Sequence, residues 1–183
     1  MRLKLTTAPA IEPVTLEEAK SHLRVDTDDD NALISTLITT AREMVEKETE
    51  RALITQIWQM YLDEAPRIIE IPKPPLQMID SIFIVDENGA EKEVDKESYI
   101  VDASGNLPGR VKLKDGYSWP SHPGFASFVV EFTAGYGDEA IDVPATIRQA
   151  ILQLVGFLYE NRGSEEIPPG VKAMLRSYKI IRL

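Results

Sequence analysis

The sequence of 183 residues contains no cysteine and only two histidines. The absence of cysteine excludes disulfide bonds and thiolate chemistry. His22 and His122 belong to no HExxH motif and to no repeated spacing of metal ligands, so a zinc site is not indicated. We interpret both histidines as surface or loop residues.

Long apolar runs and an excess of basic charge are also missing. No run approaches the roughly 20 apolar residues that span a bilayer, and residues 1–6 are not followed by the apolar stretch of a signal peptide. We therefore expect a soluble, non-secreted protein without membrane contacts. The net charge of −10 argues against a dedicated surface for duplex DNA, which would carry a basic stripe. A negative wall repels phosphate, so DNA can pass such a protein without being bound.

Helical patterns occupy the two ends of the chain. Thr15 and Glu18 have the spacing of a capping box at the start of a short helix. Apolar residues recur at three- and four-residue intervals over about 29–50, which predicts a longer amphipathic helix. The pattern returns after Pro144, and a final helix is expected over about 171–178. Both ends are too short to form a core alone, so we expect them to pack on each other.

The middle of the chain has short β-type segments separated by turn residues about every ten positions. The sequence therefore predicts an α+β fold. Residues 1–55 and 138–183 are expected to form an antiparallel helical bundle, and residues 56–137 an inserted small antiparallel β-sandwich or barrel. The first 13 residues are expected to be an extended arm, because prolines in this stretch oppose a helix.

An acidic run between the first two helices suggests a calcium site at first sight. Asp26, Asp28 and Asp30 match the first three alternate ligands of an EF-hand loop. The match then fails, because Asn31 replaces the turn glycine and Leu37 replaces the bidentate glutamate. Helix capping is therefore the favoured interpretation.

The glycines of Gly135-Tyr136-Gly137 follow a strand and precede a helix, as in a phosphate-binding loop. Their spacing is not GxGxxG and no GK[ST] follows, so a tight turn is favoured. No GxSxG motif is present, and none of the 30 acidic residues stands out as a catalytic pair. We expect no catalytic residues, no metal site and no cofactor.

The C-terminal segment differs in charge from the rest of the chain. Residues 167–183 contain four basic and no acidic side chains, with apolar side chains between them. This pattern is typical of a docking element for an acidic partner or for another copy. A last helix that completes the core, with basic residues near its C-terminal end, gives the same pattern. Both interpretations stay open.

Six short motifs follow one another along nearly the whole chain. They are PVTLEEAKSHLRVD (13–26), AREMVE (41–46), RALITQIW (51–58), FTAGYG (132–137), VP (143–144) and LYENR (158–162). In this order they resemble the tailed-phage head–tail connector, or adaptor, family. The β-rich middle is similar to the long form of that family.

The resemblance implies a non-enzymatic part of the virion neck that is made in the host cytoplasm. It implies a ring of roughly a dozen copies arranged head to tail, which docks on the portal protein, extends the DNA channel and receives a stopper or tail-completion protein. It also implies that the C-terminal segment engages the portal. The residues concerned are Val171, Lys172, Leu175, Arg176, Tyr178, Lys179, Ile180, Ile181, Arg182 and Leu183.

Two other functions stay open. A hydrolase that uses carboxylates of the β-rich middle requires two acids with coupled pKa values in one cleft. A free-standing module that binds a peptide or glycan would use Trp119 and Tyr117 as aromatic anchors.

Overall fold

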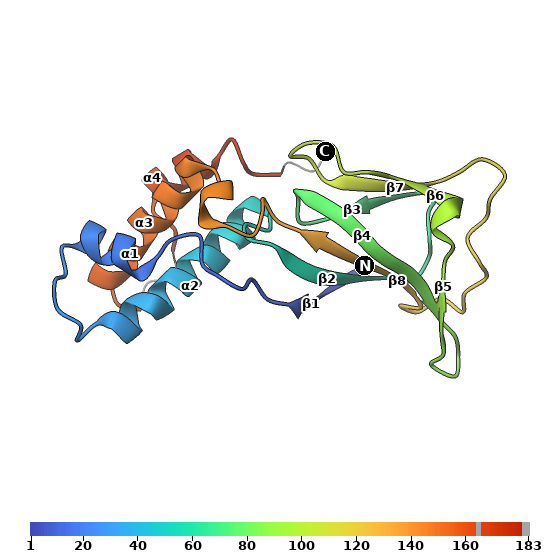
Figure 1. The fold of residues 1–183 in the computed structure, drawn as a ribbon, viewed down its shortest axis with the longest axis horizontal. Coiled ribbons are helices and arrows are strands. Elements are labelled where there is room, and N and C mark those ends of the chain that lie inside the picture. The colour runs from blue at the N-terminus through green and yellow to red at the C-terminus, as the bar shows by residue number, and fades with distance from the viewer. Residues whose placement is uncertain (164–165, 181–183) are drawn as a thin grey trace. The chain divides into compact units, whose positions relative to one another are not determined.

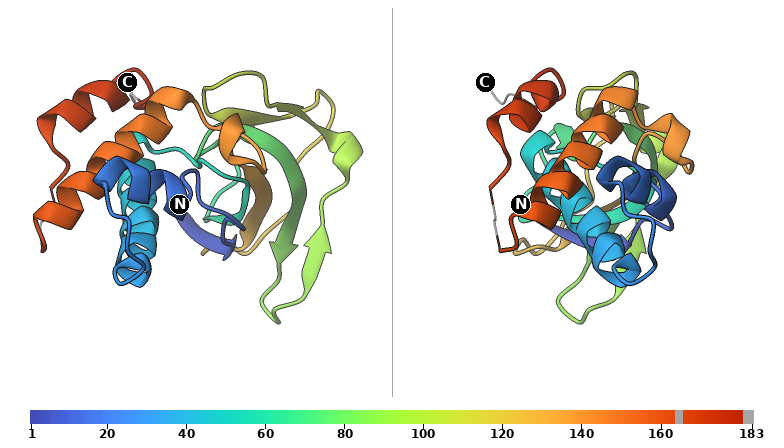
Figure 2. Two further views of the ribbon diagram at one scale, coloured as in Figure 1. Left: turned by 60° about the vertical axis from the view of Figure 1, so that its left-hand side comes forward. Right: turned by 90° about the vertical axis from the view of Figure 1, so that its left-hand side faces the viewer.

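The chain folds into two compact units, and each unit combines segments that are distant in the sequence. The computed structural model describes residues 1–163 and 166–180. The β unit consists of Met1–Pro9 and Thr55–Gly135, and the helical unit of Ala10–Ile54 and Tyr136–Leu183. Figure 1 labels the helices and strands of both units, and Figure 2 shows them from two further sides.

The β unit contains two antiparallel sheets. Its strands are β1 (Arg2–Thr7), β2 (Gln56–Leu62), β3 (Ile68–Ile71), β4 (Leu76–Val85), β5 (Glu91–Glu93), β6 (Tyr99–Asp102), β7 (Gly109–Leu113) and β8 (Phe128–Ala134). The larger sheet has the order β1-β2-β8-β4-β5 and the smaller one β3-β7-β6. Neither sheet closes on itself: β1 and β5 lie at opposite edges of the larger sheet, and β3 and β6 at opposite edges of the smaller one. The predicted α+β class is confirmed. Of the two predicted arrangements of the strands, a sandwich or a barrel, the barrel is wrong.

The start of the chain is more ordered than an arm. Residues 2–7 pair with β2 over Arg2↔Tyr61 to Thr7↔Ile57, with an irregularity after Leu5. The prolines that exclude a helix there do not exclude a strand, since Pro9 lies beyond its end. The expected extended arm therefore takes the form of an edge strand.

Alternating side chains build the core of the β unit. In β7 every second residue is buried, and in β3 the same alternation buries Ile69 and Ile71. The larger sheet contributes Met60, Ile82 and Phe132, all fully buried. This period-two pattern is the one that a half-buried strand requires.

Four helices form the helical unit. They are α1 (Leu16–Leu23), α2 (Asn31–Thr49), α3 (Ala145–Glu160) and α4 (Pro169–Leu175). The predicted capping box is confirmed at the start of α1. The hydroxyl of Thr15 accepts a hydrogen bond from the Glu18 N–H at 3.1 Å, and the Glu18 carboxylate accepts one from the Thr15 N–H at 2.8 Å. Helix α2 begins two residues later than the sequence predicts.

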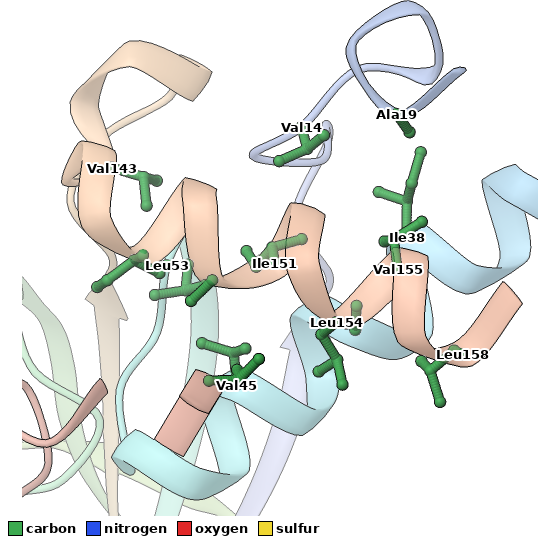
Figure 3. Packing of buried hydrophobic residues seen from close by; sticks show 14 of the residues in the cluster. Val14, Ala19, Ile38, Val45, Leu53, Val143, Ile151, Leu154, Val155 and Leu158 are labelled. Atoms are coloured by element: carbon green, nitrogen blue, oxygen red, sulfur yellow. The ribbon is translucent and has the colours of Figure 1, made fainter. Parts of the chain in front are cut away.

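Helices from both ends of the chain share one apolar core. Ile38 and Val45 of α2 lie with Ile151 and Leu154 of α3, as Figure 3 shows. Each such side chain, when fully buried, stabilises the fold by about 1.5–3 kcal/mol relative to exposure. The structure thus has the packing of N-terminal on C-terminal helices that the sequence predicts.

A buried ion cluster joins this core to the chain before α1. The guanidinium of Arg42 is only 8% exposed and donates to Glu12 and Glu46, each at 2.8 Å. Glu46 also accepts the N–H of Leu53 at 2.9 Å. These contacts compensate the cost of removing charges from water.

The FTAGYG turn carries two glycines for different reasons. Gly135 has a φ of 136°, which side chains disfavour. Gly137 lies against Asp142: a Cβ added there would come within 2.8 Å of the Asp142 Cβ. The tight-turn interpretation of this motif agrees with both observations.

We predict that Gly137→Ala lowers the free energy of unfolding by about 1–3 kcal/mol, because the added methyl group must displace Asp142. Urea denaturation of the full chain measures this difference. Gly170→Ala is the matched control, since nothing lies within 4 Å of the new Cβ. Equal stability of the two variants would contradict the close approach.

We also predict an acid-sensitive contribution of Glu18. The hydrogen bond from the Thr15 N–H, followed by attraction to Arg148, lowers the pKa of Glu18 below its ordinary value of 4.5, and partial burial opposes this shift. The resulting stabilisation is complete above pH 4.5 and disappears as the pH falls through the lowered pKa.

Glu18→Gln should therefore have a lower free energy of unfolding than the unmodified chain at pH 7, and this difference should become smaller toward pH 3. Urea denaturation across this pH range measures the difference. Glu17→Gln, an exposed neighbour, serves as the control and should show no comparable difference. A constant difference for Glu18→Gln at all pH values would refute the capping role of its charge.

Candidate partner-binding surface

The C-terminal segment combines a buried face with a basic one. Val171 and Leu175 of α4 are 3% and 1% exposed and belong to the core of the helical unit. Lys172, Arg176 and Lys179 are exposed. Both interpretations of this segment thus have a structural basis: one face completes the core, and the other presents positive charge.

The exposed basic residues surround a shallow depression. Lys172 and Arg176 are four residues apart, which places them on the same side of the helix. Together with Lys179 they border a pocket of about 300 Å³, whose other lining residues are Glu48, Pro169, Ala173 and Leu175. We call Lys172, Arg176 and Lys179 the basic patch.

Much of the charge of the basic patch is available to a partner. Within the described residues, no carboxylate oxygen lies within 4.0 Å of Lys172 or Arg176, whereas Lys179 pairs with Glu48 at 2.8 Å. Exposed side chains of this kind can pair with acidic groups at little desolvation cost.

The end of α2 holds the residues that follow α4. Arg51, which is 5% exposed, donates from Nε to the carbonyl of Tyr178 at 2.6 Å. The N–H of Ile180 donates to the carbonyl of Thr49 at 3.2 Å. With the Lys179–Glu48 pair, these contacts form what we call the tail clamp.

The other residues predicted to bind a partner divide into two groups. Tyr178 and Ile180 are half-buried and lie in the tail clamp. Ile181, Arg182 and Leu183 lie outside the described residues. Portal docking by this segment stays a prediction, and the basic patch contains its exposed side chains.

Sequence reasoning missed the tail clamp itself. Arg51 and Tyr178 are 127 positions apart, and no local spacing pattern marks a contact over that distance. Only the RALITQIW motif, which contains Arg51, marked this region at all.

The acidic run before α2 serves structural contacts. Asp28 accepts hydrogen bonds from Lys20 at 2.7 Å and from Asn31 at 3.0 Å, and these bonds lower its pKa. Asp30 accepts the hydroxyl hydrogen of Tyr159. Among the described residues, no group of three or more histidine, cysteine or acidic side chains could hold a metal ion.

The proposed aromatic anchors of the β unit are not a matched pair. Trp119 donates from its indole nitrogen to the Pro66 carbonyl at 2.9 Å and packs edge-on against Phe128, with ring centroids 5.2 Å apart. Tyr117 is 49% exposed. Trp119 is half-buried and contributes to the packing of the β unit, whereas the Tyr117 side chain is exposed.

A general acid that works near neutral pH needs a carboxyl whose pKa is raised. The carboxyl pKa values that the structure displaces, those of Glu18, Asp28 and Asp102, are all lowered. The pKa of Asp102 falls to about 2, because Ser104 and then Arg110 donate hydrogen bonds to its charged form.

No helix in the described ranges is both long and apolar enough to cross a membrane.

A family profile for the phage gp6-like head-tail connector protein matches residues 13–114. No curated protein matches the chain.

Solved structures of gene transfer agent (GTA) particles contain similar chains, each covering 100% of this chain and 97% of its own length. One, from the neck of an empty GTA particle computed with C6 symmetry, has 24% identity and a TM-score of 0.85, which supports the fold alone. A second, from the virion of the native particle, has 25% identity and a TM-score of 0.84. A third, from the native neck computed with C12 symmetry, has 25% identity and a TM-score of 0.78.

We predict that Arg51→Met loosens the tail clamp. Without the guanidinium, the Tyr178 carbonyl loses its donor, and the exchange of the Ile180 amide hydrogen should accelerate by about tenfold. Hydrogen exchange read out by NMR measures this rate. Lys172→Gln, an exposed position outside the tail clamp, is the control and should change this rate by less than about threefold. Unchanged protection in Arg51→Met would show that Arg51 does not hold the tail.

Proposed function

The chain belongs to the phage gp6-like head-tail connector family, and from this premise we propose that it forms part of the neck of a phage-like particle. In this proposal several copies form a ring that docks on the portal protein. The ring extends the DNA channel and receives a stopper or tail-completion protein on its other side. The chain acts through surfaces rather than through reactive groups.

The family match carries the proposal, since it covers more than half of the chain. The likeness to GTA chains extends it over the full length, at 25% identity for two of them. These chains belong to a native virion and to a neck computed with C12 symmetry. A cyclic arrangement of copies is the simplest assembly consistent with such a neighbour.

The charge distribution supports a docked ring through which DNA passes. The chain as a whole carries −10, while the basic patch gathers positive charge at one place. A mostly acidic surface has little affinity for phosphate, so DNA can move past it. The basic patch is then free for a protein partner, and we assign that partner as an acidic surface of the portal.

The two alternative functions gain no support from the site. An anchor pair for a peptide or glycan needs two exposed aromatic side chains, whereas Trp119 is half-buried and packs against Phe128. A carboxylate hydrolase needs an acid whose pKa is raised, whereas the carboxyl shifts in the described residues are downward.

We predict that Lys172→Glu/Arg176→Glu weakens portal binding at least tenfold, because two favourable charges become repulsive. The full chain is mixed with its portal protein; negative-stain microscopy detects the ring-shaped complex, and light scattering measures affinity. Lys47→Glu/Lys112→Glu is the control, since both lysines are exposed, lie outside the patch and change the net charge equally. These point substitutions change only exposed charges. Deletion of residues 171–183 would also remove the buried side chains of Val171 and Leu175 and so destabilise the helical unit.

Two results would count against this account in different ways. If the patch variant binds as well as the control, the basic patch is not the portal-binding surface. If the unmodified chain forms no complex with the portal, the connector function itself is wrong.

A further inference from the structure

The larger sheet of the β unit is open at both edges. At one edge, β1 is exposed at five of its six residues; at the other, all three residues of β5 are exposed. The left view of Figure 2 shows blue β1 and yellow-green β5 on opposite sides of green β4. An open edge presents main-chain N–H and C=O groups that can pair with another strand.

The two edges carry opposite charges on the same face of the sheet. The pairing Arg2↔Tyr61↔Val129↔Phe83↔Glu93 forms one row across all five strands. Arg2 and Glu93 are therefore the two ends of a single row. Because side chains two residues apart in a strand share a face, Lys4 joins Arg2 on that face, and Glu91 joins Glu93.

The direction of the strands is also matched. Each of the four neighbouring pairs in this sheet is antiparallel, so β1 and β5 run in the same direction. A rotation about an axis roughly along the strands changes neither the direction of a strand nor the face that its side chains occupy. Such a rotation can bring β5 of one copy beside β1 of the next, with acidic side chains opposite basic ones.

We propose that copies of this chain join head to tail by pairing strand β1 of one copy with strand β5 of the next, which continues the larger sheet from copy to copy. Arg2 of one copy then lies opposite Glu93 of the neighbour, and Lys4 and Glu91 lie on the same face, one on either side of this pair. This inference rests on the proposed ring, and it identifies the surface through which the ring forms.

Charge also selects this contact over competing ones. Two β1 edges would place basic side chains against each other, and two β5 edges would bring acidic side chains together. Both symmetric pairings are thus disfavoured, while the unlike pairing is attractive. A contact between two different surfaces of the same chain is the type that generates a closed ring.

Charged edge strands also occur in proteins that simply avoid aggregation. That explanation and the proposed contact predict different outcomes for charge reversal. If the charges only protect the edges, reversing one edge leaves ring formation unchanged. If the edges pair, reversing one edge weakens the ring and reversing both restores it.

The test uses two single-edge variants, Arg2→Glu/Lys4→Glu and Glu91→Lys/Glu93→Lys, and a variant that combines all four substitutions. Each single-edge variant should lower ring assembly, alone or with the portal, at least tenfold by mass photometry and negative-stain microscopy. The combined variant should return to within about threefold of the unmodified chain. Lys47→Glu/Lys112→Glu controls for the change of net charge in Arg2→Glu/Lys4→Glu, and thermal unfolding confirms that each variant is folded.

A cross-link gives a second, independent reading. The chain has no cysteine, so Arg2→Cys/Glu93→Cys introduces the sole pair, at the two ends of one row of the sheet. These positions lie at opposite edges of one sheet, so a disulfide between them joins two copies. Oxidation of assembled rings should produce a ladder of linked copies on a denaturing gel, whereas Lys47→Cys/Glu93→Cys should not.

The outcomes separate this inference from the function on which it rests. If rings of the unmodified chain form, both single-edge variants assemble equally well and no ladder appears, the edge contact is overturned and the connector function stands. If the unmodified chain forms no ring, either alone or with the portal, both proposals are overturned.

Discussion

The helical core depends on a meeting of the two ends of the chain. Ile38 and Val45 of α2 cover Ile151 and Leu154 of α3, so neither segment can remove its apolar stripe from water alone. Everything between the two segments must therefore leave and return at nearby points. Ile54 and Gly137 form a parallel bridge, and the N–H of Tyr136 donates to the Leu53 carbonyl at 2.9 Å. The chain returns at the FTAGYG turn. There Gly137 pairs with Ile54 and lies so close to Asp142 that a larger residue would collide with it.

The same constraint shapes the candidate partner-binding surface. Helix α4 has seven residues, too few to be stable alone in water. It is retained because Val171 and Leu175 enter the shared core and because the tail clamp holds the residues that follow. Stability and recognition are thus divided between two faces of one short segment. The basic patch therefore lies on a segment that is fixed to the core of the helical unit.

The sequence anticipated much of the fold and part of the site. The capping box, the helices, the α+β class and the tight turn all follow from residues a few positions apart, and the structure has each of them. The basic character of the C-terminal segment was equally visible. The sequence did not show that residues 2–7 would join the larger sheet, nor that the sheets would stay open, because alternation along a strand does not identify its neighbours.

The sequence by itself therefore determined the local structure, the net charge and the family resemblance, since each depends on the order of neighbouring residues. Only the tertiary structure decided which charges lie together. It brought Arg51 to Tyr178 across 127 positions, and it placed Arg2 and Glu93 at the two ends of one row of the larger sheet. The physical reason is that packing and strand pairing select partners by shape and hydrogen bonding in space, and separation along the chain carries no record of that selection.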